Sequence, residues 1–97
     1  MTKAYWIARV DVTDDEAYGR YRDLNAVAFN QFGARFIVRG PAGKTAMGTS
    51  RKHNVVLEFA DYETALACYN SPEYQAAKVY LEKAGDVDLV IVPGYAP

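Results

Sequence analysis

The stretch from residue 58 to residue 77, EFADYETALACYNSPEYQAA, limits the fold more than any other segment of the chain. Asp61 is a typical N-cap that directly follows a strand-like run, and Asn70 is a typical residue at which a helix ends. Ser71 and Pro72 then supply a second N-cap and a first helical position. The stretch therefore predicts the end of a strand followed by two consecutive helices, at 61–69 and 72–84.

The remaining elements follow from periodicity and from stop signals. Thr13 and Glu16 form a capping-box pattern, which predicts a helix that continues to Gly33. The connection at 41–52 contains glycine, proline and several cations, and it could form a short extra strand pair at 45–47. Alternating or β-branched runs predict four strands, at 4–12, 34–40, 53–60 and 87–92.

The resulting order, β-α-β-β-α-β, is typical of the ferredoxin-like α+β plait. In this fold an antiparallel four-stranded sheet carries its helices on one face. The chain has 97 residues, which suits one domain, so we expect residues 1–97 to form a single ferredoxin-like domain.

The strands predict two different sheet faces. With unbroken alternation, Phe36 and Val38 point toward the helices, whereas Arg35, Ile37 and Arg39 point away from them. The face away from the helices keeps too many apolar side chains to stay in water, namely Tyr5, Ile7, Ile37, Val56, Val90 and Val92. A second copy of the chain would cover this surface, so we expect a homodimer whose two sheets face each other.

Composition narrows the range of partners. The 11 Lys and Arg residues and 12 Asp and Glu residues give a net charge of −1, which argues against nucleic acid and against an anionic membrane as partners. No long apolar segment follows Lys3, and the single cysteine excludes an internal disulfide, so we expect a cytoplasmic protein. His53 and Glu58 would point to opposite strand faces, and no spacing suits a metal or a phosphate-bearing cofactor, so we predict neither metal nor cofactor.

The first candidate site lies on the face away from the helices and combines three arginines with one carboxylate. Arg9 and Arg39 could orient an anionic substrate, because guanidinium groups bind carboxylates in a bidentate manner. Glu58, beside Arg35, is the leading candidate for proton transfer. The alternative interpretation is an ion-pair network that fixes the register of the dimer.

The second candidate site lies between the helices and the sheet. Asn25 falls on the apolar stripe of the first helix, and a buried amide needs a partner, which a ligand could provide. Trp6 and Tyr74 would shape the pocket with Tyr18 and Tyr21, and His53 is a weaker catalytic candidate. The alternative is an ordinary core. The pocket could therefore lie in this layer or between the sheets of two copies.

Several segments together resemble the family called domain of unknown function 1330. They are YWIARVDVTD at 5–14, GARFIVRG at 33–40, NVVLEF at 54–59, YNSPEYQAAK at 69–78 and DLVIVPG at 88–94. The resemblance implies a dimeric α/β barrel, in which two ferredoxin-like sheets face each other with their helices outside. Proteins with that architecture include small cofactor-free monooxygenases, muconolactone isomerases and haem enzymes, so the fold alone does not define a reaction.

Taken together, these features predict a cytoplasmic protein that binds a small organic acid. It could be a cofactor-free enzyme of the monooxygenase or isomerase kind. The alternatives are a ligand-binding or sensing module without catalysis, and a purely structural dimer.

Overall fold

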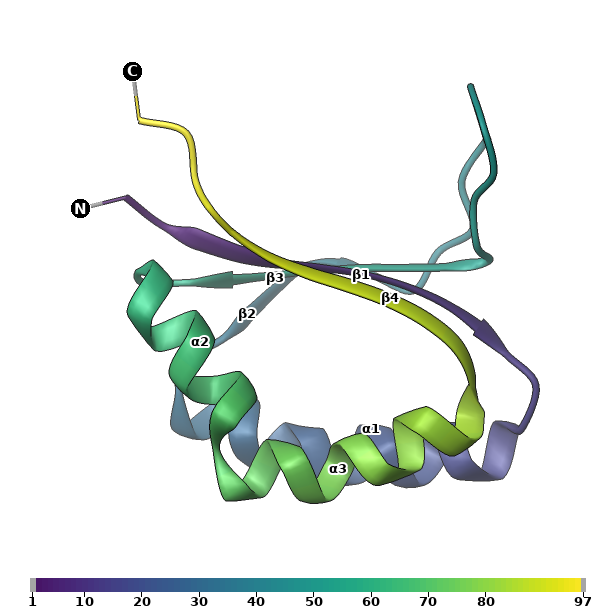
Figure 1. The fold of residues 1–97 in the computed structure, drawn as a ribbon, viewed down its shortest axis with the longest axis horizontal. Helices are drawn as coiled ribbons and strands as arrows, with labels where there is room; N and C mark the ends of the chain where they lie inside the picture. Colours follow the sequence, from purple (N-terminus) through teal and green to yellow (C-terminus); the bar gives the residue numbers. More distant parts are fainter. Residues whose placement is uncertain (1, 97) are drawn as a thin grey trace.

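The four strands form one antiparallel sheet in the order β2-β3-β1-β4. The computed structural model describes residues 2–96. All three helices lie on one side of the sheet (Figure 1), which confirms the predicted ferredoxin-like α+β fold. The elements in chain order are β1 (Ala4–Val12), α1 (Asp15–Gln31), β2 (Arg35–Arg39), β3 (His53–Phe59), α2 (Tyr62–Asn70), α3 (Pro72–Ala84) and β4 (Gly85–Pro93).

The predicted junction between α2 and α3 is confirmed. Asp61 Oδ1 accepts a hydrogen bond from Thr64 N at 2.8 Å, and Ser71 Oγ accepts one from Tyr74 N at 3.2 Å. Each side chain satisfies a free amide of the first helical turn. This junction places Tyr74 in the first turn of α3, where its side chain is only 1% exposed.

The N-cap of α1 is Asp14, whose Oδ1 accepts a hydrogen bond from Ala17 N at 3.1 Å. The prediction that Thr13 caps this helix was wrong. The Thr13 hydroxyl instead donates to the Ala84 carbonyl at 3.2 Å, and its amide donates to the same oxygen at 2.7 Å. Thr13 therefore connects the start of α1 to the end of α3.

The chain passes from α3 into β4 without a loop, and β4 begins two residues earlier than predicted. Gly85 is the first residue of the strand, at a point where it lies against β1. A Cβ atom at this position would overlap the carbonyl oxygen of Asp11. The close approach of the two backbones therefore requires glycine here.

An irregularity in β2 changes which side chains face the helices. Phe36 is opposite Leu57, but after a register shift at Ile37 it is Arg39 that is opposite Val55. Cross-strand partners lie on the same face, and one extra residue in a bulge reverses the alternation. Arg39 therefore lies on the helix-covered face. The predictions that placed Arg39 on the outer face and Val38 on the inner face were wrong, because they assumed unbroken pairing.

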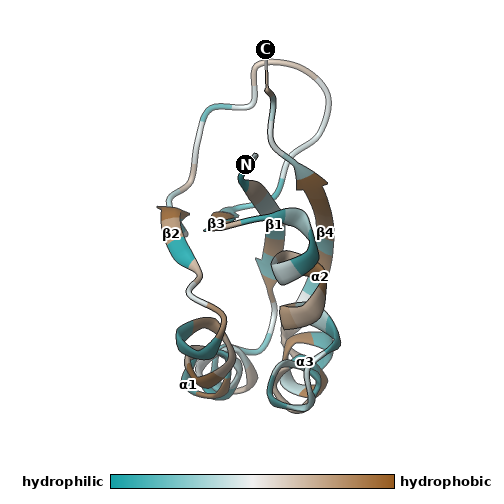
Figure 2. Cartoon of the chain, turned by 90° about the vertical axis from the view of Figure 1, so that its left-hand side faces the viewer, coloured by the Kyte–Doolittle hydropathy of each residue, from teal (hydrophilic) through white to brown (hydrophobic). Residues whose placement is uncertain are grey.

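The core centres on Trp6 of β1. Its ring is 4.8 Å from that of Tyr74 and 5.4 Å from that of Phe29, both in edge-on geometry, and its Nε1 donates to the Ala65 carbonyl at 3.0 Å. These contacts join the sheet to all three helices. Figure 2 shows α1 and α3 side by side, with α1 below β2 and α3 below β4.

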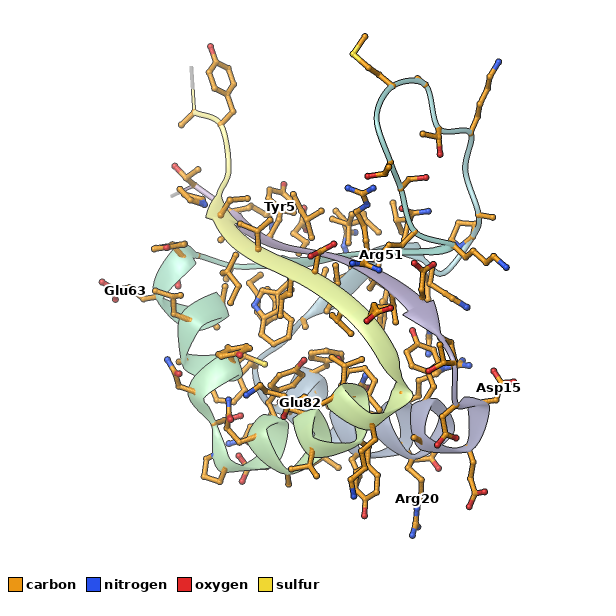
Figure 3. All side chains as sticks on the ribbon, turned by 45° about the vertical axis from the view of Figure 1, so that its right-hand side comes forward. Tyr5, Asp15, Arg20, Arg51, Glu63 and Glu82 are labelled. Atoms are coloured by element: carbon orange, nitrogen blue, oxygen red, sulfur yellow. The ribbon has the colours of Figure 1, made fainter. Side chains whose placement is uncertain are left out.

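The connection between β2 and β3 extends away from the sheet on the side opposite the helices (Figure 1). It contains no strand, so the extra pair expected at 45–47 does not form. Arg51 anchors its end through Asp11 at 3.0 Å and Asp88 at 2.8 Å. Tyr5 and Arg51 both lie at the sheet, away from α1 and α3 (Figure 3).

Candidate ligand-binding site

A cavity of about 270 Å³ lies between the sheet and helices α1 and α3. Its volume is close to the lower end of the roughly 300–1,000 Å³ typical of ligand pockets, so it suits a small ligand. Most of its wall is aromatic or aliphatic. These apolar wall residues include Trp6, Val10, Phe29, Phe36, Val55, Leu57, Leu81, Val87 and Leu89.

One part of the cavity wall carries two arginines and a histidine. Arg22 comes from α1, Arg39 from the end of β2 and His53 from the start of β3. The His53 ring lies 5.5 Å from the ring of Tyr18, and the guanidinium carbon of Arg39 lies 4.3 Å above the ring of Phe36. Both arginines are exposed, so this part of the wall is in contact with solvent.

The charges of Arg22 and Arg39 both act on the hydroxyl of Tyr18. Burial raises the pKa of its hydroxyl, while the positive charges of Arg22 and Arg39 both oppose that rise. Within residues 2–96, neither arginine forms a salt bridge. An anion that entered here would therefore meet two guanidinium groups with no carboxylate already bound to them.

A second polar group lies deeper in the wall. The hydroxyls of Tyr21 and Tyr74 are 2.9 Å apart and share one hydrogen bond. Burial raises the pKa of Tyr21 to about 12, although the hydrogen bonds with Tyr74 and Asn25 lower it in part. Burial also raises the pKa of Tyr74, and the nearby Tyr21 adds to that effect. Both phenols therefore stay neutral at physiological pH and can donate hydrogen bonds.

The structure brings most of the predicted site residues together. Trp6, Asn25, Arg39, His53 and Tyr74 all line the cavity. Asn25 is 7% exposed and lies on the same helix as Tyr21.

The other two predicted site residues lie on the opposite face of the sheet. Glu58 accepts a hydrogen bond from the Tyr5 hydroxyl at 3.2 Å and pairs with Arg35 at 3.2 Å and Lys3 at 3.7 Å. Arg9 donates to the Thr49 carbonyl at 2.9 Å. The sheet therefore divides the first predicted cluster, and Arg39 does not join Arg9 and Glu58 as expected.

Among the wall residues that sequence reasoning missed are Arg22, Phe29 and Phe36. Arg22 stands one helical turn after Tyr18, and that i, i+4 spacing was the available signal. Phe29 and Phe36, 5.8 Å apart in edge-on geometry, were assigned no role in the site.

Among the described residues, no group of three or more His, Cys, Asp or Glu side chains could hold a metal ion. No helix in the described part is long and apolar enough to cross a membrane.

Three of the similar solved structures show how this fold recurs at low sequence identity. RPA0582, a protein of unknown function from Rhodopseudomonas palustris, is 17% identical with a TM-score of 0.73, over 99% of this chain and 85% of that one. A dimeric ferredoxin-like protein from Jannaschia sp. CCS1 is 16% identical with a TM-score of 0.65, over 93% of this chain and 97% of that one. SnoaB, a cofactor-independent oxygenase from Streptomyces nogalater, is 9% identical with a TM-score of 0.65, over 100% of this chain and 97% of that one.

These likenesses support the fold alone, because all three identities are low. No curated protein matches the chain. The family model for the domain of unknown function DUF1330, in contrast, matches residues 3–95. The chain belongs to the DUF1330 family.

Proposed function

We propose that this protein binds a small organic acid with a planar, mostly apolar body in the cavity between the helices and the sheet. The observation that carries the proposal is the combination of an aromatic wall with two arginines, Arg22 and Arg39, that form no salt bridge within residues 2–96. An aromatic wall favours a flat apolar body. Guanidinium groups favour a carboxylate.

Trp6 makes the proposal directly testable, because it is the only tryptophan in the sequence and it lines the cavity. We expect benzoate to change the fluorescence of Trp6 saturably, and benzyl alcohol, which has no charge, to bind more weakly. Calorimetric titration should give the same order. If neither compound binds at millimolar concentrations to folded protein, the proposal fails.

A second candidate function is turnover of the bound acid, with His53 as the proton acceptor. It is favoured by the position of His53 in the cavity wall, which Arg39 and Gly40 also line. Imidazole is the commonest general base in enzymes. The fold of SnoaB, which is a cofactor-independent oxygenase, is compatible with this candidate.

Proton exchange distinguishes an enzyme from a binding or sensing module. In D₂O, an enzyme of this kind should exchange the protons next to the ketone of phenylpyruvate faster than buffer does, as followed by NMR. His53→Gln should remove the acceleration while phenylpyruvate still binds. Saturable binding with no acceleration would favour the module without catalysis.

We also propose that a second copy packs against the outer sheet face. Ile7 and Val90 are cross-strand partners there and are 39% and 49% exposed, and Ile37 is 47% exposed. A sheet packed across them would bury this apolar surface. The Jannaschia protein of the same fold is dimeric. Sedimentation velocity should find a dimer for the wild type and a monomer for Val90→Glu, and a wild-type monomer would contradict the proposal.

The cytoplasm remains our proposed location. The support is the single Cys68, which is buried and free and cannot form a disulfide within the chain. Fractionation of the native host, followed by immunoblotting, would test the location directly.

A further inference from the structure

The Tyr21–Tyr74 pair is a polar group that a carboxylate-binding cavity does not need. Both rings line the cavity, and their hydroxyls are 2.9 Å apart. In such a pair one hydroxyl donates to the other, so the hydrogen of the second hydroxyl is not used within the pair. That hydroxyl can bind an additional acceptor.

The chemistry of the pair selects the kind of acceptor. Two neutral phenols beside the Asn25 amide can donate hydrogen bonds and accept them, but they carry no charge. A hydroxyl or carbonyl oxygen of a ligand fits such a group. The carboxylate of the same ligand fits the arginines better, because charge-assisted hydrogen bonds are about twice as strong as neutral ones.

The tyrosine pair and the arginines come from different parts of the cavity wall. Tyr74 comes from α3, is 1% exposed and packs against Trp6 and Phe29. Arg39 comes from the edge strand β2, is exposed and packs on Phe36. The tyrosine pair therefore lies deep in the core and Arg39 lies at the solvent-exposed rim, with the aromatic wall between them.

We infer that the natural ligand carries a second oxygen, a hydroxyl or carbonyl group remote from its carboxylate, and that the Tyr21–Tyr74 pair binds this oxygen with the help of Asn25. The ligand class is then a hydroxyaryl or oxo carboxylic acid rather than a simple aromatic acid. The inference rests on the proposed function, because it assumes that the cavity holds an organic acid.

The test compares benzoate with its 3-hydroxy and 4-hydroxy derivatives, using Trp6 fluorescence and calorimetry. We expect the wild type to bind one of the hydroxylated acids about three- to tenfold more tightly than benzoate, the gain typical of one neutral hydrogen bond. In the Tyr21→Phe/Tyr74→Phe double variant this ratio should fall to near one, while benzoate itself still binds.

Tyr69→Phe is the matched control. The ring of Tyr69 lies 5.5 Å from that of Tyr74, but Tyr69 is not part of the wall of this cavity. The control should keep the wild-type preference. Circular dichroism checks the fold of each variant, and Tyr21→Phe alone replaces the double variant if the latter does not fold.

The possible results separate the two proposals. Equal binding of all three acids by the wild type would overturn this inference and leave the proposed function intact. A preference that survives the loss of the hydroxyls would also overturn the inference, since the oxygen would then bind elsewhere. If none of the acids binds, the proposed function fails, and this inference fails with it.

Discussion

The outer and inner faces of the sheet hold their charged side chains in contrasting ways. On the outer face several charged side chains form ion pairs, as Glu58 does with Arg35 and Arg51 does with Asp11 and Asp88. On the inner face Arg39 lines a cavity and forms no salt bridge within the described residues. The sheet therefore carries networks of ion pairs on one side and, within residues 2–96, an arginine without a salt bridge in the cavity wall on the other.

This difference indicates where a ligand is to be expected. A carboxylate such as Glu58, with three polar partners, already has its hydrogen-bonding capacity largely used. An arginine beside an aromatic wall has donors to spare and can bind an anion that enters from solvent. The inner face is the better candidate for ligand binding, and the outer face for structure and association.

The largest effect should come from Trp6→Ala. Removal of this buried side chain leaves a cavity at the centre of the core, and comparable substitutions cost about 3–5 kcal/mol. Ile7→Ala, the next residue and on the outer face, is the matched control. Urea denaturation should show a much smaller loss for Ile7→Ala, and that loss should depend on protein concentration because the residue is proposed to lie in a dimer interface. Equal, concentration-independent losses would remove the distinction between the faces.

Arg39→Gln should have the next largest effect. Loss of a charge-assisted hydrogen bond typically costs about 1.5–3 kcal/mol, so calorimetry should find benzoate binding weakened at least tenfold with little change in stability. Arg9→Gln, on the outer face, is the matched control and should leave binding unchanged. Weakened binding in Arg9→Gln with unchanged binding in Arg39→Gln would instead place the anion on the outer face, at the first of the two predicted sites.

The position of Arg39 also shows where sequence reasoning ends. The caps at Asp61 and Ser71 were predictable because each depends on residues within one helical turn. The face of Arg39 depends on a bulge in the pairing of β2 with β3, and RFIVR contains no local sign of it. Non-local pairing therefore decides which arginine reaches the cavity.

Thr13 gives a second example of the same limit. Thr13 and Asp14 are both good N-cap residues, so local preference does not choose between them. The hydrogen bond from Thr13 to the Ala84 carbonyl, 71 residues away, makes that choice.

The pocket was predictable only in part. Its pattern in the sequence allowed us to propose Trp6, Asn25 and Tyr74 as pocket residues. The cavity volume depends on the spacing between the helices and the sheet, which no short pattern encodes.

The alkaline pH dependence of stability should show a smaller effect that belongs to the inner face. The pKa of Tyr21 is about 12 in the folded protein and about 10 for an unfolded chain. Between these values the folded state holds more protons, so its stability falls as the pH rises from about 10 to about 12. Urea denaturation should show a slope shallower by up to about 1.4 kcal/mol per pH unit in Tyr21→Phe. Tyr95→Phe, which removes a tyrosine that is 89% exposed, should keep the wild-type slope.

The smallest effect on global stability should come from the outer-face ion pairs, because exposed pairs contribute little and are screened by salt. Asp11 nevertheless accepts hydrogen bonds from the Lys52 amide and from Arg51, each at 3.0 Å, and these lower its pKa. The lowered pKa means that its contribution is present near neutral pH and is lost as the pH falls through the folded value.

Asp11→Ala should therefore release the 40–52 loop without unfolding the domain. Trypsin should cleave at Lys44, Arg51 or Lys52 several-fold faster than in the wild type, while the urea midpoint changes little. Asp88→Ala removes only one partner of Arg51 and should have an intermediate effect. A large loss of stability in Asp11→Ala would mean that the outer-face charges hold the sheet itself. The two faces would then be similar in structural role. They would differ mainly in whether their arginines are available to bind an anion.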